Sequence, residues 1–173
     1  LGEPTMELKT FSNLKKLYYK SFPPQERISL WLLMVNSWRR LGRWHLYQEK
    51  GNLIAFAYTV ETAELYFILL LAVAPEHQSQ GYGSLILQEL IQTAGLKSVL
   101  ITIEPMDQQS ENYSQRLKRL AFYEKNSFEL TNHYYHEGEE TYQIITKNSK
   151  TELEKFEKIM QRFFGKSLKI KVD

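Results

Sequence analysis

The sequence predicts a single α+β domain, residues 1–173, built around a mixed β-sheet. Its 173 residues, 43% of them hydrophobic, suffice for one buried core, and a charged fraction of 24% is typical of a globular chain. The pattern of expected elements contains strand hairpins together with one strand–helix–strand crossover. That mixture favours a mixed sheet over a doubly wound parallel sheet.

The first part of the chain predicts two helices. Apolar residues recur at helical spacing over about residues 10–21 and again over 28–41, and Pro23 ends the first run. The inward stripe of the second helix is expected to comprise Leu30, Leu33, Met34 and Trp38.

Three strands are expected next, at residues 44–49, 53–61 and 64–74. The turn at 50–52 contains Gly51 and predicts a hairpin between the first two. The third strand is a nearly continuous apolar run, which is typical of a strand buried on both faces.

The second part of the chain alternates helices and strands before it ends in a hairpin, a helix and a short strand. The expected elements are a helix at 83–94, a strand at 99–103, a helix at 115–126, a hairpin of 130–136 with 141–147, a helix at 153–164 and a strand at 168–172. The inward face of the 115–126 helix is expected to carry Leu117, Leu120 and Ala121.

Composition excludes several classes of protein. The absence of cysteine excludes disulfides and thiol chemistry, and the four histidines lack metal-ligand spacing, so no metal is expected. No basic face, long apolar run or secretion signal is present, so we expect no nucleic acid, no membrane and a cytoplasmic location. Residues 61–147 carry a net charge of −6, which either favours a cationic substrate or reflects an unevenly charged surface.

The segment from Val73 to Ser84 is the best candidate for binding a ligand, because a glycine-bearing loop there joins a buried strand to a helix. First-turn amides lack backbone partners, and the helix dipole adds positive potential, which suits a phosphate. Gly81 and Gly83 have no Cβ and would let the backbone approach an anion closely. A Gly-x-Gly pair also occurs for turn geometry alone.

Two phosphate-binding motifs can be tested on this loop. The P-loop needs lysine after its last glycine, but Ser84 follows Gly83. The dinucleotide fingerprint needs a third small residue where Ile86 stands, although Glu104 lies where a ribose-binding acid would. A nicotinamide-dependent oxidoreductase therefore remains a remote alternative.

Two ordered motifs resemble the GNAT N-acetyltransferases, and in particular their bacterial members. Residues 78–83, Gln-Ser-Gln-Gly-Tyr-Gly, match the Gln/Arg-x-x-Gly-x-Gly/Ala loop of that family, and residues 71–75 look like its fourth strand. Residues 119–128 resemble its Phe-Tyr-x-x-x-Gly-Phe segment, and 22–27 resemble a Phe-Pro-x-x-Glu-Arg stretch of some bacterial members. The resemblance covers about residues 6–147, with 148–173 as an extension.

The resemblance implies a mostly antiparallel sheet with one splayed parallel pair and helices on both faces. It implies transfer of an acetyl group from acetyl-CoA, without a metal, to a primary amine of a small molecule or peptide by direct attack. It leaves open a monomer or a homodimer. Residues 148–173 lie outside the resemblance. The apolar stripe of the helix at 153–164 is expected to pack on its own domain or, alternatively, this helix or the strand at 168–172 forms a dimer contact.

The resemblance also implies where the cofactor binds. Amides of the loop would hold the pyrophosphate, and backbone groups where the parallel strands splay would pair with the pantetheine arm. The implied cofactor residues are Leu71, Val73, Gln78, Ser79, Gln80, Gly81, Tyr82, Gly83, Ser84 and Arg116. Gln78 stands where arginine is commoner, and Arg116 where the family often has asparagine.

For catalysis, the resemblance assigns Tyr123 as the acid that protonates the departing thiolate. The carboxylate that many members carry in the fourth strand is missing here, so Glu104 is the first substitute for the base and Glu26 the second. The missing carboxylate leaves a catalytically weak acetyl-CoA-binding module, a sensor or scaffold, as an alternative. Arg27 could bind a substrate carboxylate or pair with Glu26, and Ser127 is expected to strain a left-handed turn where the family has glycine.

Overall fold

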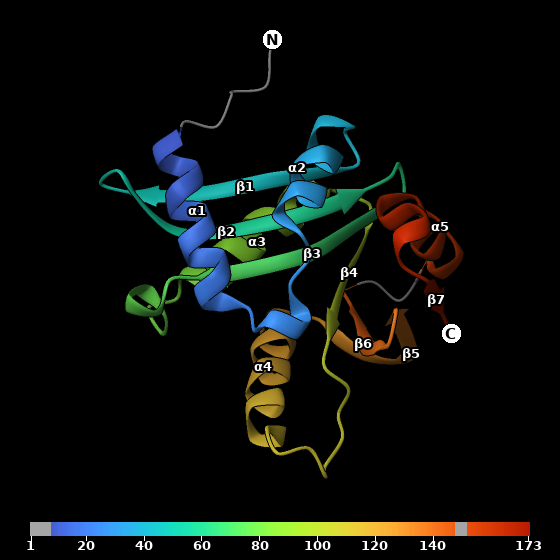
Figure 1. Cartoon of the computed structure of the whole chain (residues 1–173). Coiled ribbons are helices and arrows are strands. Elements are labelled where there is room, and N and C mark those ends of the chain that lie inside the picture. The colour runs from blue at the N-terminus through green and yellow to red at the C-terminus, as the bar shows by residue number, and fades with distance from the viewer. Residues whose placement is uncertain (1–7, 148–151) are drawn as a thin grey trace.

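The computed structural model describes residues 8–147 and 152–173 (Figure 1). Residue 6, where the family resemblance was expected to begin, and residues 148–151 lie outside the described part. Helices and strands follow one another in the predicted order. The α-helices are α1 (Leu8–Ser21), α2 (Leu30–Trp38), α3 (Tyr82–Ala94), α4 (Tyr113–Lys125) and α5 (Leu153–Phe164). The strands are β1 (Gly42–Glu49), β2 (Asn52–Glu61), β3 (Leu65–Val73), β4 (Ser98–Ile103), β5 (Glu129–Glu137), β6 (Glu140–Thr146) and β7 (Ile170–Val172).

The strands described form one mixed sheet, in the order β1-β2-β3-β4-β6-β5-β7. Only β3 and β4 are paired in parallel, joined by the crossover through α3, and the other neighbours are antiparallel. The predicted fold class, with one parallel pair in a mostly antiparallel sheet, is confirmed.

The parallel pair separates partway along its length. Residues 65–68 of β3 pair with 98–101 of β4, and the pairing stops there. Just beyond, the register between β2 and β3 shifts because Leu69 forms a β-bulge: Tyr58 pairs with Leu70 and Thr59 with Ile68. The rest of β3 therefore diverges from β4 and leaves a gap toward the carboxyl ends of both strands.

Helices cover both faces of the sheet, as expected. On one face, α1, α2 and α5 pack over a core that includes Phe56, Phe67 and Phe156, each fully buried. On the other face, α3 and α4 pack over Ile68 and Ile101. Figure 1 shows α1 and α2 in front of the strands and α3 behind them. Because α5 buries its apolar stripe on its own sheet and β7 pairs with β5, the C-terminal extension completes this domain.

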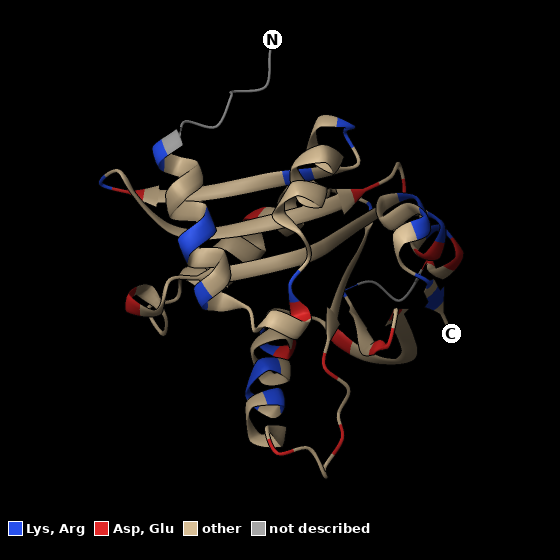
Figure 2. Ribbon diagram, in the orientation of Figure 1, with Lys and Arg blue, Asp and Glu red and all other residues tan. Residues whose placement is uncertain are grey.

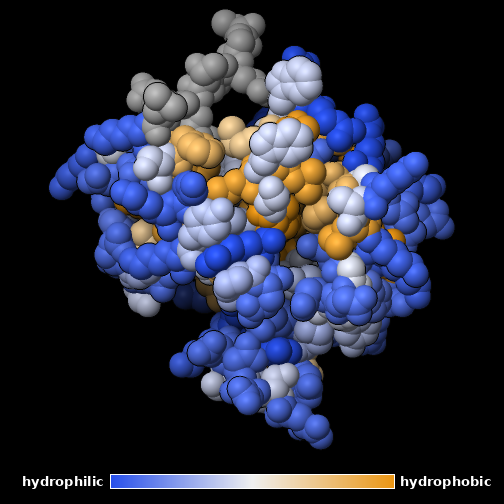
Figure 3. Space-filling model, in the orientation of Figure 1, coloured by the Kyte–Doolittle hydropathy of each residue, from blue (hydrophilic) through white to orange (hydrophobic). Residues whose placement is uncertain are grey.

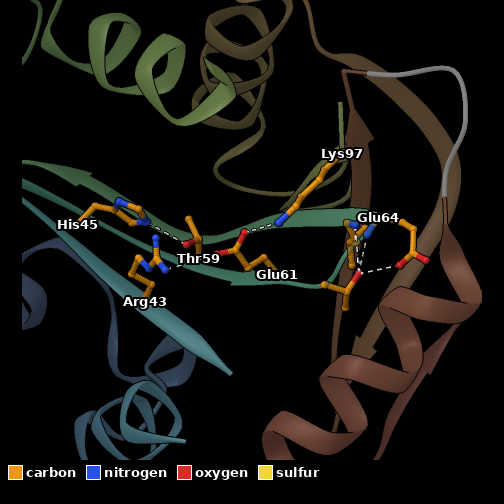
Figure 4. A network of polar contacts seen from close by, with 8 residues as sticks. Arg43, His45, Thr59, Glu61, Glu64 and Lys97 are labelled. Carbon is orange, nitrogen blue, oxygen red and sulfur yellow. Dashed lines mark hydrogen bonds and ion pairs between the residues drawn. The ribbon is translucent and has the colours of Figure 1, made fainter. Parts of the chain in front are cut away.

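A network of polar contacts holds the end of β2 that lies far from the gap between β3 and β4 (Figure 4). Glu61 forms ion pairs with Arg43 of β1, at 4.0 Å, and with Lys97, which precedes β4. Beside it, His45 Nε2 lies 2.9 Å from Thr59 Oγ1, and burial lowers the pKa of His45. This network links the edge strand to the start of the parallel pair.

The apolar stripes that the sequence predicted for α2 and α4 differ from the faces that these helices bury. In α2, Trp38 is 82% exposed, because the helix ends there and Arg40 takes a left-handed conformation with φ of 59°. Hydrophobic side chains therefore reach the surface around α2 (Figure 3). In α4, Leu117 and Ala121 are exposed, and Tyr123 is buried instead. The inward face of α4 is rotated because it covers the polar end of β4.

None of the helices within residues 8–147 and 152–173 is long and apolar enough to cross a membrane.

Candidate active site

The loop after β3 has the backbone geometry of an anion-binding turn. Ser79 and Gly81 both take left-handed conformations, with φ of 61° and 86°. The first hydrogen bond of α3 runs from Leu85 N–H to the Gly81 carbonyl, at 3.1 Å. The amides of residues 82–84 precede this bond, so they have no acceptor within the helix and can face an anion.

Side chains of the loop form hydrogen bonds that hold the loop in its conformation. Gln80 Nε2 donates to the Glu76 carbonyl at 2.9 Å, and the Tyr82 hydroxyl donates to Glu49 at 3.1 Å. Gln78 Nε2 donates to the Val73 carbonyl, also at 2.9 Å. The expectation that this carbonyl is free to pair with a cofactor is therefore wrong for the structure as it stands, because Gln78 occupies it.

The unpaired edge of β3 faces the gap. The N–H of Ala74 donates to the Ile54 carbonyl of β2 at 2.7 Å. Peptide groups of a strand alternate in direction, so those of Leu71 and Val73 point away from β2, toward β4. Their N–H groups remain available at the place where the sequence predicted them.

Gly83 lies in close contact with α4. A Cβ added there would lie 3.2 Å from the Phe122 ring of α4, which is closer than ordinary contact. Next to it, Asn126 Nδ2 donates to Ser84 Oγ at 3.2 Å. The beginning of α3 is thus held directly against the end of α4. The turn after α4 contains Ser127 at φ of 69°, so the expected left-handed serine is confirmed.

A pocket of about 490 Å³ runs into the gap between β3 and β4. It joins the two faces of the sheet, because Tyr123 belongs to the α3–α4 side whereas Tyr142 packs on the α1–α2–α5 side. The expected site residues that line it are Glu26, Leu71, Val73, Gln78, Glu104 and Tyr123. Residues 79–84 form the adjacent loop, and Arg27 and Arg116 lie outside the lining.

Tyr123 presents a hydroxyl without a hydrogen-bond partner among the described residues, although only 9% of the residue is exposed. Its ring is fixed by Phe122 and Phe128, with centroids 5.1 and 5.9 Å away. Burial raises the pKa of Tyr123, so the phenol keeps its proton at neutral pH. The residue is suited to donate a proton into the pocket.

Glu104, at the end of β4, is neutralised by two arginines. Arg119 Nη1 lies 3.0 Å and Arg116 Nη2 3.5 Å from its carboxylate, and Asn112 Nδ2 donates to it at 2.8 Å. Arg116 also donates to the Pro105 carbonyl at 2.7 Å. The guanidinium of Arg116 is therefore engaged inside this cluster and lies outside the pocket lining.

Arg27 and Glu26, the two residues expected to bind the substrate, take different positions in the structure. Arg27 Nε and Nη2 donate to the carbonyls of Phe22 and Tyr19, at 2.8 and 2.9 Å, and so cap the C-terminal end of α1. Arg27 forms no ion pair with Glu26, which instead lines the pocket. Burial, and next the negative charge of Glu104, raise the pKa of Glu26.

Sequence reasoning missed Glu137, the last residue of β5, which lines the same pocket. Burial raises the pKa of Glu137 to about 7, and the charge of Glu140 acts in the same direction. The sequence assigned Glu137 to the hairpin turn. Strand alternation from Tyr135, which is fully buried, places Glu137 on the same inward face and was the signal that could have found it.

Known proteins support the same picture. A sequence model of the acetyltransferase (GNAT) domain matches residues 40–130. A protein assigned to the GNAT family from Bacteroides thetaiotaomicron superposes with a TM-score of 0.72 at 20% identity, covering 91% of this chain and 90% of its own. Arabidopsis thaliana Naa50, in complex with a bisubstrate analogue of CoA and a peptide, gives 0.60 at 15%, covering 82% and 94%. A GNAT acetyltransferase from Elizabethkingia anophelis with bound acetyl-CoA gives 0.57 at 18%, covering 84% and 93%.

A search of curated protein sequences returned no match. At these identities the structural likeness establishes the fold. The family match is independent of it and spans 91 of the 173 residues, counted from 40 to 130. It includes the phosphate-type loop, the splayed strands and Tyr123. The chain belongs to the GNAT acetyltransferase family.

Proposed function

We propose that this protein is an acetyl-CoA-dependent N-acetyltransferase whose acceptor is a primary amine. One observation carries the proposal: the gap between β3 and β4 connects the free amides at the start of α3 with a pocket that holds an unpartnered phenol and half-buried carboxylates. The fold therefore offers an anion site in the loop next to a pocket that is lined by an unpaired strand edge and proton-transfer groups.

The residues present fit acetyl-CoA. Amides of Tyr82 to Ser84, helped by the left-handed turn at Gly81, would bind the pyrophosphate, and the N–H groups of Leu71 and Val73 would pair with the pantetheine amides. Gln78 would release or share the Val73 carbonyl. Bound acetyl-CoA supplies the activated acetyl group.

Tyr123 is proposed as the general acid. Tyr123 lines the pocket, and its hydroxyl has no hydrogen-bond partner among the described residues and keeps its proton because burial raises its pKa. A positioned acid of this kind contributes about 10²- to 10⁴-fold to a rate. No other tyrosine lines the α3–α4 side of the pocket in the described chain.

Glu137 is proposed as the base, ahead of Glu104 and Glu26. An alkylammonium must lose a proton before its nitrogen can attack, and a carboxylate with a pKa of about 7 accepts that proton near neutral pH. Glu104 has its oxygens engaged by Arg119, Arg116 and Asn112, which favours a positioning role at the end of β4.

The alternative of a catalytically weak binding module rested on the missing carboxylate in the strand that is β3 here. Glu137 supplies a carboxylate from β5 instead, which favours catalysis. The remote alternative of a nicotinamide-dependent oxidoreductase loses its support. Ile86, at the third position of that fingerprint, is buried in the contact between α3 and the sheet.

Release of CoA thiol from acetyl-CoA, measured with a panel of primary amines, tests the proposal. We expect amine-dependent release by the wild type and a fall of at least about 100-fold in kcat for Tyr123→Phe, with acetyl-CoA affinity retained. Tight binding of acetyl-CoA without release for any amine would favour the binding module instead.

A further inference from the structure

Two carboxylates in the pocket, those of Glu26 and Glu137, have no ion-pair partner among the described residues. Lys20 and Arg119 also line the pocket, but Lys20 pairs with Glu76 at 3.9 Å and Arg119 with Glu104 at 3.0 Å. Within the described residues, neither Glu26 nor Glu137 has a Lys or Arg at ion-pair distance. Both are partly removed from water, so each leaves a carboxylate that a cation in the pocket would stabilise.

The two carboxylates approach the pocket from different elements. Glu26 comes from the short turn Pro24–Glu26 between α1 and α2, and Glu137 from the end of β5. Tyr142 lines the same pocket: burial, and then the charges of Glu137, Glu26, Glu140 and Glu104, raise its pKa. Figure 2 shows acidic residues (red) where the chain passes from α1 toward α2, below β4 and in the β5–β6 hairpin, around the same part of the molecule.

A second observation, an unpartnered hydroxyl in the same pocket, points to a ligand in this space. The Tyr123 hydroxyl belongs to a residue that is only 9% exposed, lines the same pocket and lacks a partner among the described residues. At the same time Arg27, the cation that could have bound a substrate carboxylate, is turned to the end of α1. The pocket thus offers two carboxylates to an ammonium group, whereas its described cations, Lys20 and Arg119, are each paired with a glutamate.

We infer that the acceptor is a small molecule with at least two ammonium groups, one reacting beside Glu137 and the other held by Glu26. This inference rests on the proposed acetyl transfer. The reacting ammonium gives one proton to Glu137, and its nitrogen forms the N–C bond as the C–S bond of the thioester breaks. The departing thiolate takes the proton of Tyr123, and the second proton lost by the nitrogen passes to the Tyr123 phenolate, so that the product is a neutral amide. A monoamine would leave the second carboxylate partly desolvated and unpaired, which costs binding.

Matched pairs of amines test the inference. We expect kcat/KM for 1,4-diaminobutane to exceed that for 1-aminobutane by about 10- to 100-fold, the range for a hydrogen bond to a charged group. Spermidine and the aminoglycoside kanamycin A distinguish the two sources of such cations, a flexible chain and a rigid ring system. Binding of the same compounds to the CoA-loaded protein, measured by calorimetry, gives a readout that does not need turnover.

The role of the Glu26 charge is tested with Glu26→Gln, which removes the charge and keeps the shape of the side chain. We expect the diamine-to-monoamine ratio of kcat/KM to fall by about tenfold or more. Glu129→Gln removes the same charge at the exposed start of β5 and should leave the ratio unchanged. Equal use of diamine and monoamine by the wild type would overturn the inference and leave acetyl transfer intact. Preferential diamine binding without CoA release would support the dication site and overturn acetyl transfer.

Discussion

Replacing Glu137 with glutamine changes stability and activity in opposite directions. Burial raises the pKa of Glu137 from 4.5 to about 7, so the folded protein binds this proton more tightly than the unfolded chain does. The stabilisation from that proton is fully present below about pH 4.5 and is lost as the pH rises through 7. At about 1.4 kcal/mol per pKa unit, the ionised carboxylate costs the fold at most about 3 kcal/mol at pH 8.

Glu137→Gln stays neutral and escapes this cost. Urea unfolding should therefore show the variant more stable than the wild type at pH 8, by at most about 3 kcal/mol, with the difference shrinking to under about 1 kcal/mol at pH 5. Glu129→Gln, at an exposed position on the same strand, should show no such pH dependence.

Activity should fall while stability rises. The wild type should lose kcat/KM as the pH drops below about 7, because the base becomes protonated. Glu137→Gln should lose this limb of the pH profile and about 10²- to 10⁴-fold in rate. An unchanged pH profile in the variant, together with a stability difference that is the same at pH 5 and pH 8, would refute the assignment of Glu137.

Three further changes have defined outcomes. Tyr123→Phe should reduce kcat by at least about 100-fold and change the Kd for acetyl-CoA by less than about twofold in calorimetry; an unchanged kcat would remove Tyr123 as the acid. Gly83→Val should push against the Phe122 ring 3.2 Å from the new Cβ, lowering stability in urea by about 1–3 kcal/mol and weakening acetyl-CoA binding, whereas normal affinity would make the loop purely structural. Arg27→Ala removes the cap at the end of α1 and should cost about 1–3 kcal/mol of stability without raising KM for the amine; a raised KM would return Arg27 to the substrate site.

The sequence predicted the order of elements because local patterns are strong here. Hairpin turns, an apolar run over β3 and glycine at the start and end of α3 mark the boundaries to within a few residues. It failed where tertiary contacts override the pattern. The Trp38 stripe required α2 to continue, but the left-handed Arg40 ends it, and the face of α4 turned because its inner position holds Arg116 against Glu104.

Some residues of the candidate site could likewise be predicted from the sequence, and others could not. Loop residues and Tyr123 could be predicted because their spacing along the chain is fixed by one strand, one turn and two helices. The partners of Arg27 and Arg116 are backbone carbonyls and an acid, which no spacing reveals. Glu137 reaches the pocket only because the sheet order brings β5 and β6 beside β4, and this is information about pairing rather than about local sequence.

Thermal unfolding with acetyl-CoA, CoA or NAD in parallel tests the central claim most directly. A ligand at 100 times its Kd stabilises the fold by about 2.7 kcal/mol, or about 5–11 °C for a chain of this size. The account predicts a shift of that size with acetyl-CoA and CoA and none with NAD. A folded sample whose Tm does not move with acetyl-CoA would contradict it, because the loop before α3 and the gap between β3 and β4 would then bind no cofactor.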